Sequence, residues 1–140
     1  MFYSMTMTVP PNTTYLNAIE ESIALMHGVI VRVIFRSRPG NASLLHVKVF
    51  HNRHQYFPGS GDDDLHSDGE PLQWEEHLEI TQKPFYLEIQ AWNDDDTYPH
   101  TFDIAFAVLP KYAVLPFAFM SIVSNLVAAI SPKRIFTRSS

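Results

Sequence analysis

The residues of this sequence that are best suited to chemistry are acidic, and they gather in two stretches of the second half. No Lys or Arg occurs between Arg53 and Lys83, a segment that holds eight carboxylates. A second cluster runs from Asp94 to Asp96. Hard divalent ions such as Ca²⁺ are bound by several oxygen ligands on loops. The pattern predicts either a calcium site or a solvated acidic surface. The candidate ligands are Asp62, Asp64, Asp94, Asp96 and Asp103.

Histidines offer a second kind of metal site. The spacing His51-x-x-His54, together with His66, places three imidazoles on one polar segment, and such a set suits Zn²⁺ or Ni²⁺. The alternative is that these three side chains are simply exposed. His46 and His77 fall within expected strands, where we predict that they lie on a sheet face.

The sequence gives little support for catalysis. It contains no Gly-rich phosphate loop, no Gly-x-Ser-x-Gly turn and no His-Glu-x-x-His motif. Glu75 and Glu76 are adjacent on an expected strand, so their side chains point to opposite faces and cannot form a carboxylate pair. The absence of Cys also excludes a thiol nucleophile, a disulfide and a thiolate metal site. We therefore predict that the protein is not an enzyme.

Two tryptophans next to polar segments, Trp74 and Trp92, are candidates for stacking on a sugar ring. The alternative, which we favour, is that one or both anchor a hydrophobic core. Aromatic residues make up 13% of the chain, which favours strands and interfaces over a helical bundle.

The elements that must position these residues are strands. Alternating or β-branched segments recur between turn residues, with no strong helical period among them. The clearest strands are expected at 3–9, 29–36, 44–50, 72–80, 85–92 and 101–109. A further short strand is a candidate at 14–19, whereas 20–27 suits either a helical turn or a loop, and 52–71 is expected to be a long polar excursion. The sequence predicts an all-β fold, an antiparallel β-sandwich of the jelly-roll or C2-like type.

The run Pro71-Leu72-Gln73-Trp74-Glu75-Glu76, followed by the strand that ends at Asp94-Asp95-Asp96, resembles the second half of a C2 domain. In that family a Pro-x-Trp-Asn-Glu strand precedes a strand that ends in an Asp-x-Asp calcium loop. Here one extra residue separates Pro71 from Trp74, and Glu75 replaces the Asn. The resemblance implies a module that binds Ca²⁺ or lipid, with Asp94 and Asp96 as ligands and Asp103 as a further one.

Charge is distributed unevenly along the chain. Its 140 residues carry a net charge of −5, but residues 1–103 hold six Lys and Arg against fifteen Asp and Glu, whereas residues 104–140 hold four basic residues and no acid. Binding of nucleic acid requires cations that neutralise phosphates. The acidic body is therefore not expected to bind nucleic acid.

The C-terminal part differs in composition from the rest, so we divide the chain into a sandwich domain (1–110) and an apolar, basic tail (111–140). Residues 113–130 contain no charge, a length at which a membrane-spanning helix becomes a candidate. We favour the alternative, a strand and a helix buried against the domain or a neighbouring copy. The tail residues expected to make these contacts are Lys111, Pro116, Phe117, Phe119, Ile122, Val123, Leu126, Lys133 and Arg134.

These observations favour a non-enzymatic structural or assembly subunit that binds sibling copies or other subunits, with the sandwich displayed and the tail packed on neighbours. A virion or phage coat, decoration or spike protein fits, as does a small accessory subunit of a membrane complex that touches lipid through 113–130. This hypothesis rests on fold-level analogy. The N-terminus lacks the pattern of a cleavable signal peptide. The alternatives are a C2-like module for Ca²⁺ or lipid and a carbohydrate-binding sandwich.

Overall fold

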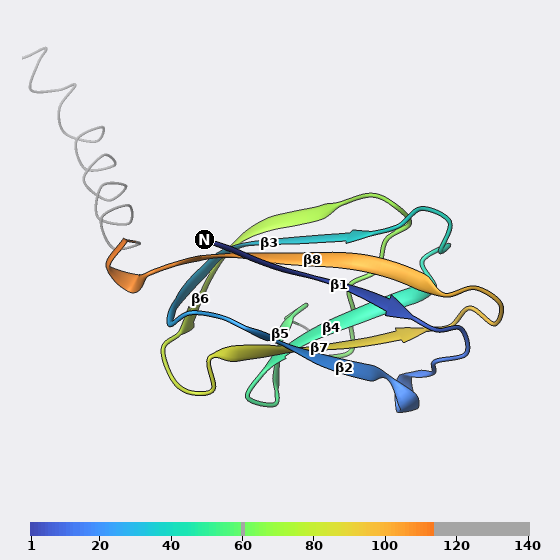
Figure 1. Ribbon diagram of the computed structural model, residues 1–140, viewed down its shortest axis with the longest axis horizontal. Coiled ribbons are helices and arrows are strands. Elements are labelled where there is room, and N and C mark those ends of the chain that lie inside the picture. Colours follow the sequence, from blue (N-terminus) through green and yellow to red (C-terminus); the bar gives the residue numbers. More distant parts are fainter. Residues whose placement is uncertain (60, 114–140) are drawn as a thin grey trace, which may run out of the picture.

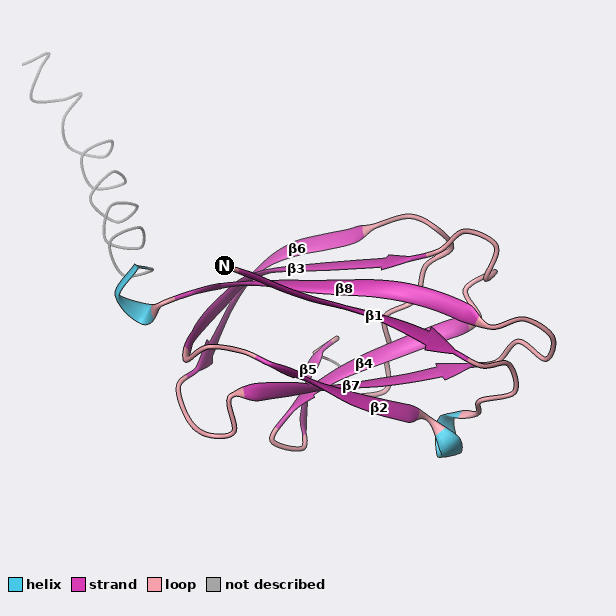
Figure 2. Ribbon diagram, in the orientation of Figure 1, coloured by secondary structure: helices cyan, strands magenta, loops and turns pink. Residues whose placement is uncertain are grey.

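The computed structural model describes residues 1–59 and 61–113, which form two antiparallel four-stranded sheets packed face to face (Figure 2, strands in magenta). The predicted all-β sandwich is therefore confirmed. A 3₁₀ turn, η1 (Tyr15–Asn17), precedes the second strand. The strands are β1 (Phe2–Val9), β2 (Ile19–Ala24), β3 (Gly28–Ser37), β4 (Leu45–His51), β5 (His54–Phe57), β6 (Leu72–Ile80), β7 (Tyr86–Asn93) and β8 (His100–Leu109).

The strand order is that of a jelly roll. One sheet, called sheet I, has the order β1-β8-β3-β6, and the other, sheet II, has the order β2-β7-β4-β5 (Figure 1). The first strand thus pairs with the last, the second with the seventh, the third with the sixth and the fourth with the fifth. This is the pattern of one long hairpin rolled up so that β8 also meets β3 and β7 also meets β4. Of the two sandwich types left open by the sequence, the structure has the jelly roll.

The core lies between the two sheets and follows the two-residue period of the strands. Phe35, Phe102 and Phe106 of sheet I are fully buried, as are the aliphatic side chains that sheet II contributes. Phe57 of β5 and Phe106 of β8 stack across the interface with ring centroids 6.3 Å apart. Burying each large apolar side chain contributes about 1.5–3 kcal/mol, so this layer stabilises the fold.

Three segments differ from the sequence expectation. Of residues 20–27, left open between a helical turn and a loop, 20–24 belong to the edge strand β2, because pairing with β7 decides their conformation. The short strand considered at 14–19 is wrong, since 15–17 form η1, whose Tyr15 packs edge-on against Trp92. The polar excursion contains the four-residue strand β5, too short to give a periodic signal.

Residues 61–71, which follow β5, form one isolated β-bridge with sheet II. Val47 of β4 and Leu65 exchange two backbone hydrogen bonds, 3.0 and 2.8 Å long. β5 pairs with β4 only from Val49 onward, so Leu65 takes the place beside Val47 that β5 leaves empty. Its side chain is buried in the core, so the neighbouring side chains of Asp64 and His66 lie on the outer face of sheet II.

Candidate functional site

The first candidate is the open edge of β1. Among the described residues β1 pairs only with β8. Met1 and Val108 exchange both backbone hydrogen bonds, at 3.0 and 2.8 Å. Because hydrogen-bonded and non-hydrogen-bonded pairs alternate along an antiparallel ladder, the next residue along, Phe2, directs its N–H and C=O away from β8. Ser4, Thr6 and Thr8 follow the same alternation. The N–H and C=O groups of these three residues and of Phe2 therefore point to the open edge, away from β8.

The other three edges carry features that discourage pairing with another chain. β2 carries Glu20 and Glu21, and β5 is only four residues long. β6 carries three glutamates and faces a register shift between Ile30 and Arg32 of β3. Charges, short strands and bulges are the usual means by which proteins block an exposed sheet edge. The sequence of β1, FYSMTMTV, contains no charged residue and no Pro, so its edge is unguarded.

A shallow groove of about 540 Å³ continues from this edge across the outer face of sheet I. Its apolar part comes from strands β1, β3 and β8, and its polar rim comes chiefly from β6. Phe2 at the end nearest the edge is 62% exposed. The lining residues are Phe2, Val31, Arg32, Glu75, Glu76, His77, Ala107 and Leu109.

The second candidate site is a histidine–carboxylate cluster on the outer face of sheet II. Asp64 Oδ1 lies 2.7 Å from His46 Nδ1 and 2.9 Å from His66 Nδ1. Asp94 Oδ2 lies 3.0 Å from His46 Nε2, on the opposite side of the ring. Within 1–59 and 61–113, the one group of three or more potential metal ligands is His46, Asp64 and His66, whose ligand atoms all lie within 4.8 Å of one another.

The remaining residues predicted as calcium ligands lie apart from this group. Asp62 is exposed, and Asp96 accepts a hydrogen bond of 2.8 Å from Thr97 Oγ1. Asp103 accepts one of 2.6 Å from Thr6 Oγ1 and lies 3.2 Å from the Arg38 guanidinium. Of the five predicted residues, the structure brings Asp64 and Asp94 to one histidine, which the sequence assigned to a sheet face and not to a site.

The predicted imidazole trio is wrong in its membership. His51 and His54 lie at the turn between β4 and β5, where they line a small cleft with Glu79. His66 instead lies beside His46, with ring centroids 5.7 Å apart. The bridge between Val47 and Leu65 brings His66 beside His46, and this contact between distant parts of the chain leaves no spacing pattern in the sequence.

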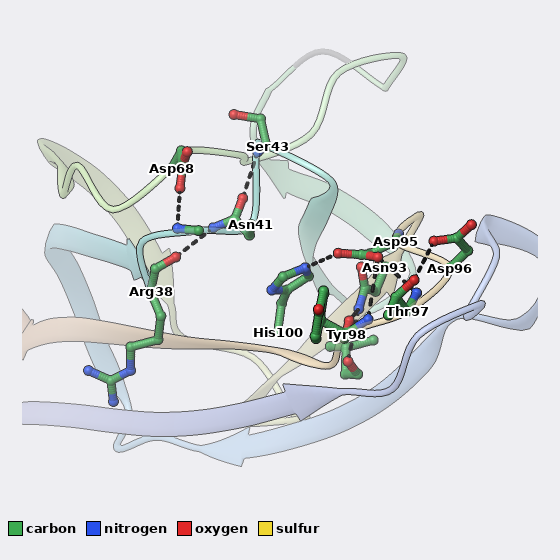
Figure 3. Close-up of polar contacts among 12 residues, drawn as sticks. Arg38, Asn41, Ser43, Asp68, Asn93, Asp95, Asp96, Thr97, Tyr98 and His100 are labelled. Carbon is green, nitrogen blue, oxygen red and sulfur yellow. Dashed lines mark hydrogen bonds and ion pairs between the residues drawn. The ribbon is translucent and has the colours of Figure 1, made fainter.

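A second Asp–His pair stabilises the turn between β7 and β8 (Figure 3). Asp95 Oδ1 accepts hydrogen bonds from the backbone N–H of Thr97 (2.9 Å) and of Tyr98 (3.3 Å), and Oδ2 lies 2.7 Å from His100 Nε2. The Thr97 hydrogen bond, followed by that of His100, lowers the pKa of Asp95 below its ordinary value. Fully buried Asn93 completes the turn, because its Nδ2 donates to the Val9 and Tyr98 carbonyls.

The two tryptophans do not form a shared binding surface, because Trp74 belongs to sheet I and Trp92 to sheet II. Trp92 is only 6% exposed; His46 stacks on its ring with centroids 5.1 Å apart, and Tyr15 packs edge-on at 4.9 Å. Trp74 is half-buried against Phe57 and lines an open cleft of about 470 Å³. Both rings therefore pack against other aromatic side chains of the domain.

Of the predicted tail residues, the structure describes only Lys111, whose Nζ lies 3.5 Å from Glu79 Oε2. Pro116, Phe117, Phe119, Ile122, Val123, Leu126, Lys133 and Arg134 lie outside the described residues. The part of the chain that the structure describes contains no helix with the length and apolar character needed to cross a membrane.

Comparison with known proteins gives distant structural likenesses alone. No protein-family model and no curated protein sequence matches the chain. Hydroxypropylphosphonic acid epoxidase from S. wedmorenis is 10% identical over 76% of this chain, with a TM-score of 0.38, and the match spans 43% of the epoxidase chain. A chain of the cyanophage Pam1 capsid asymmetric unit is 17% identical over 75% of this chain and 79% of that one, with a TM-score of 0.44. The jelly-roll assignment rests on the strand order itself.

Proposed function

We propose that this protein is a non-enzymatic structural or assembly subunit of a larger complex, in the manner of a virion or phage coat, and that its copies join through the edge of β1. The observation that supports the proposal is the uncharged, eight-residue edge strand with unpaired backbone groups at four outward positions. Such an edge is a template for pairing with another chain. A protein that works alone is expected to block it, as the other three edges of this molecule are blocked.

A second copy of the chain is the partner that this edge suits best. Two β1 strands related by a two-fold axis pair antiparallel, so that the same residues supply donors and acceptors on both sides. No charge is brought opposite a like charge, because β1 carries none. Each new backbone hydrogen bond contributes about 0.5–1.5 kcal/mol. Pairing also extends the groove of sheet I across the junction, with Phe2 of each copy available for contact.

The tail remains the second element of the proposal. Lys111 and Tyr112 line an open, mostly apolar cleft with Met26 and His27 at the end of the sandwich where the tail begins. Packing of residues 111–140 on neighbouring subunits, as predicted from their apolar and basic composition, adds contacts to those of β1. Location in a virion or in a membrane-associated assembly is part of this proposal.

The test is Ser4→Pro, compared with Ser22→Pro. Ser4 is exposed on β1 and its N–H points to the open edge, so Pro there removes a donor for a partner strand but no bond to β8. Ser22 is its match on the edge strand β2, opposite Glu88 of β7. The Leu25 N–H to Phe85 C=O bond fixes the same parity there, so the Ser22 N–H also points outward.

Size-exclusion chromatography with light scattering gives the readout. We expect wild-type protein and Ser22→Pro to run as dimers or larger species, and Ser4→Pro to dissociate at least about ten-fold more readily, a change of 1.4 kcal/mol or more. A monomeric wild-type protein at high micromolar concentration would contradict assembly altogether. Assembly that persists in Ser4→Pro but is lost in Phe117→Asp would assign the interface to the tail instead of β1.

A further inference from the structure

The cluster on sheet II has a geometry that assembly through β1 does not use. His46 comes from β4, whereas Asp64 and His66 come from the 61–71 segment, two residues apart in extended chain. Because side chains alternate in extended chain, these two lie on the same face, and Leu65 between them points into the core. The Val47–Leu65 bridge makes His46 and His66 cross-strand neighbours, since residue 46 lies opposite residue 66 when 47 pairs with 65.

The distances within the cluster suit a metal ion of small radius. Bonds from zinc to nitrogen and oxygen ligands are about 2.0–2.2 Å long, so two ligands at the tetrahedral angle lie roughly 3.4 Å apart. The Asp64 oxygen lies 2.7 and 2.9 Å from the two Nδ1 atoms. Each of these separations is roughly half an ångström shorter than a tetrahedral ion requires. The three ligand atoms all lie within 4.8 Å of one another, so small rotations of the side chains can bring them onto one face of a coordination sphere. Half of the His66 side chain is exposed, at 48%, which leaves the other face open to water.

The surroundings of His46 are those of a metal-binding histidine. A histidine that binds metal through one ring nitrogen commonly donates its other N–H to a carboxylate, which fixes the tautomer and the ring orientation. Asp94 Oδ2, 3.0 Å from Nε2, is placed to accept that bond while Nδ1 faces Asp64. The Trp92 ring, parallel to the imidazole within 15°, holds the plane of the ring. His46 is thus oriented from two directions before any ligand arrives.

The ligand set also selects the class of metal. Two imidazoles and one carboxylate suit first-row transition ions such as Zn²⁺, Fe²⁺ and Co²⁺, whereas Ca²⁺ takes six to eight oxygen ligands. Lys48, the next outward residue on β4, directs its Nζ to the Gly61 carbonyl at 2.9 Å. The Lys48 amine is thus paired with a backbone carbonyl, and the ion pairs of the Asp64 carboxylate within 4 Å are those with the two histidines.

We propose that His46, Asp64 and His66 form a binding site for a divalent transition-metal ion, with Asp94 as the carboxylate that orients His46. The ion joins β4 to the 61–71 segment and so stabilises the attachment of that segment to sheet II. This site shares Asp64 with the calcium site predicted from the acidic clusters, but its other two ligands are histidines and it takes a different class of ion.

The test uses the full chain without a histidine tag, stripped of metal with a chelator. Isothermal titration with Zn²⁺ is expected to give one site per chain, and Co²⁺ is expected to give visible ligand-field absorption. His66→Ala removes a ligand at an exposed position, and we expect at least a ten-fold loss of Zn²⁺ affinity. Asp94→Asn keeps all three ligands and is expected to weaken binding by about 10–100-fold. Circular dichroism confirms that each variant is folded.

The matched control is the pair His51→Ala and His54→Ala, which removes the imidazoles of the β4–β5 turn. These variants are expected to bind Zn²⁺ with unchanged affinity. Zn²⁺ binding that is absent at millimolar concentration, or that is the same in His66→Ala as in wild type, would overturn the proposal. So would loss of binding in the control pair, or Ca²⁺ binding tighter than that of Zn²⁺.

Discussion

The two sheets of the sandwich differ in how their outer faces are covered. On sheet II, Lys48 and Trp92 point away from the core and yet are each only 6% exposed, because Tyr15 of η1, His46 and the Gly61 carbonyl surround them. On sheet I, the outward residues of β1 are exposed, and Phe2 is 62% exposed. Within residues 1–59 and 61–113, the irregular segments pack on sheet II and leave the outward residues of β1 exposed.

This difference separates two kinds of interaction on one small domain. A face that is built over by loops holds polar side chains in fixed positions, which suits a small ligand. A bare face with an open edge suits another protein chain, because backbone pairing there does not depend on preformed side-chain geometry. The two proposals above accordingly assign the ion to sheet II and the partner chain to sheet I.

The largest expected effect tests what the two sheets share. Phe106→Ala removes the ring that joins sheet I to Phe57 of sheet II, and we expect it to lower the free energy of unfolding by about 3–5 kcal/mol. Urea unfolding followed by circular dichroism measures the change. Phe2→Ala, on the exposed side of sheet I, is expected to change stability by less than about 0.5 kcal/mol. An equal loss of stability in the two variants would show that Phe2 is buried in solution, contrary to the exposed outer face of β1 in the structure.

The next effect concerns sheet II alone. Leu65→Ala empties the core position beside Val47 and is expected to lower the free energy of unfolding by about 2–3 kcal/mol. Because Asp64 and His66 depend on this anchor, Zn²⁺ affinity is expected to fall with it, although no ligand has been removed. Assembly through β1 is expected to persist in this variant at concentrations where it remains folded. Loss of assembly together with loss of metal binding would show that the sheets do not act separately.

The smallest effect lies at the turn between β7 and β8, which links the sheets. The folded state lowers the pKa of Asp95, so this carboxylate stabilises the fold above its unfolded pKa, near 3.8, and the contribution is lost as the pH falls through the folded value. Asp95→Asn is expected to flatten the dependence of the urea midpoint on pH in the acid range. Asp96→Asn, which removes a neighbouring charge but no acceptor of these backbone N–H groups, serves as the control.

The strands were predictable wherever the period is long and clean. The expected strand at 72–80 coincides with β6, and the strand expected at 85–92 corresponds to β7, whose Leu87, Ile89 and Ala91 are buried in the core. β2 and β5 were not predictable, since short edge strands owe their conformation to their partners rather than to their own sequence.

The His46 cluster escaped prediction for a related reason. His46 of β4 lies eighteen positions before Asp64 in the sequence, and the two meet because Leu65 fills a gap in sheet II. The gap beside Val47 cannot be predicted from the spacing of residues in the sequence. Asp64 and Asp94 were predicted as calcium ligands, and the structure places both beside His46, a histidine assigned to a sheet face.

The pairing of the first strand with the last has a consequence for how the chain folds. The innermost hairpin, β4 with β5, is local, whereas Phe2 of β1 finds its partner at Ala107. Pairings between distant residues form slowly, and during synthesis β1 leaves the ribosome long before β8 exists. Both sides of β1 are then unpaired. In a cell that makes many copies, a nascent β1 can be captured by the β8 of another molecule, so an exchanged first strand is the misfolded form to expect.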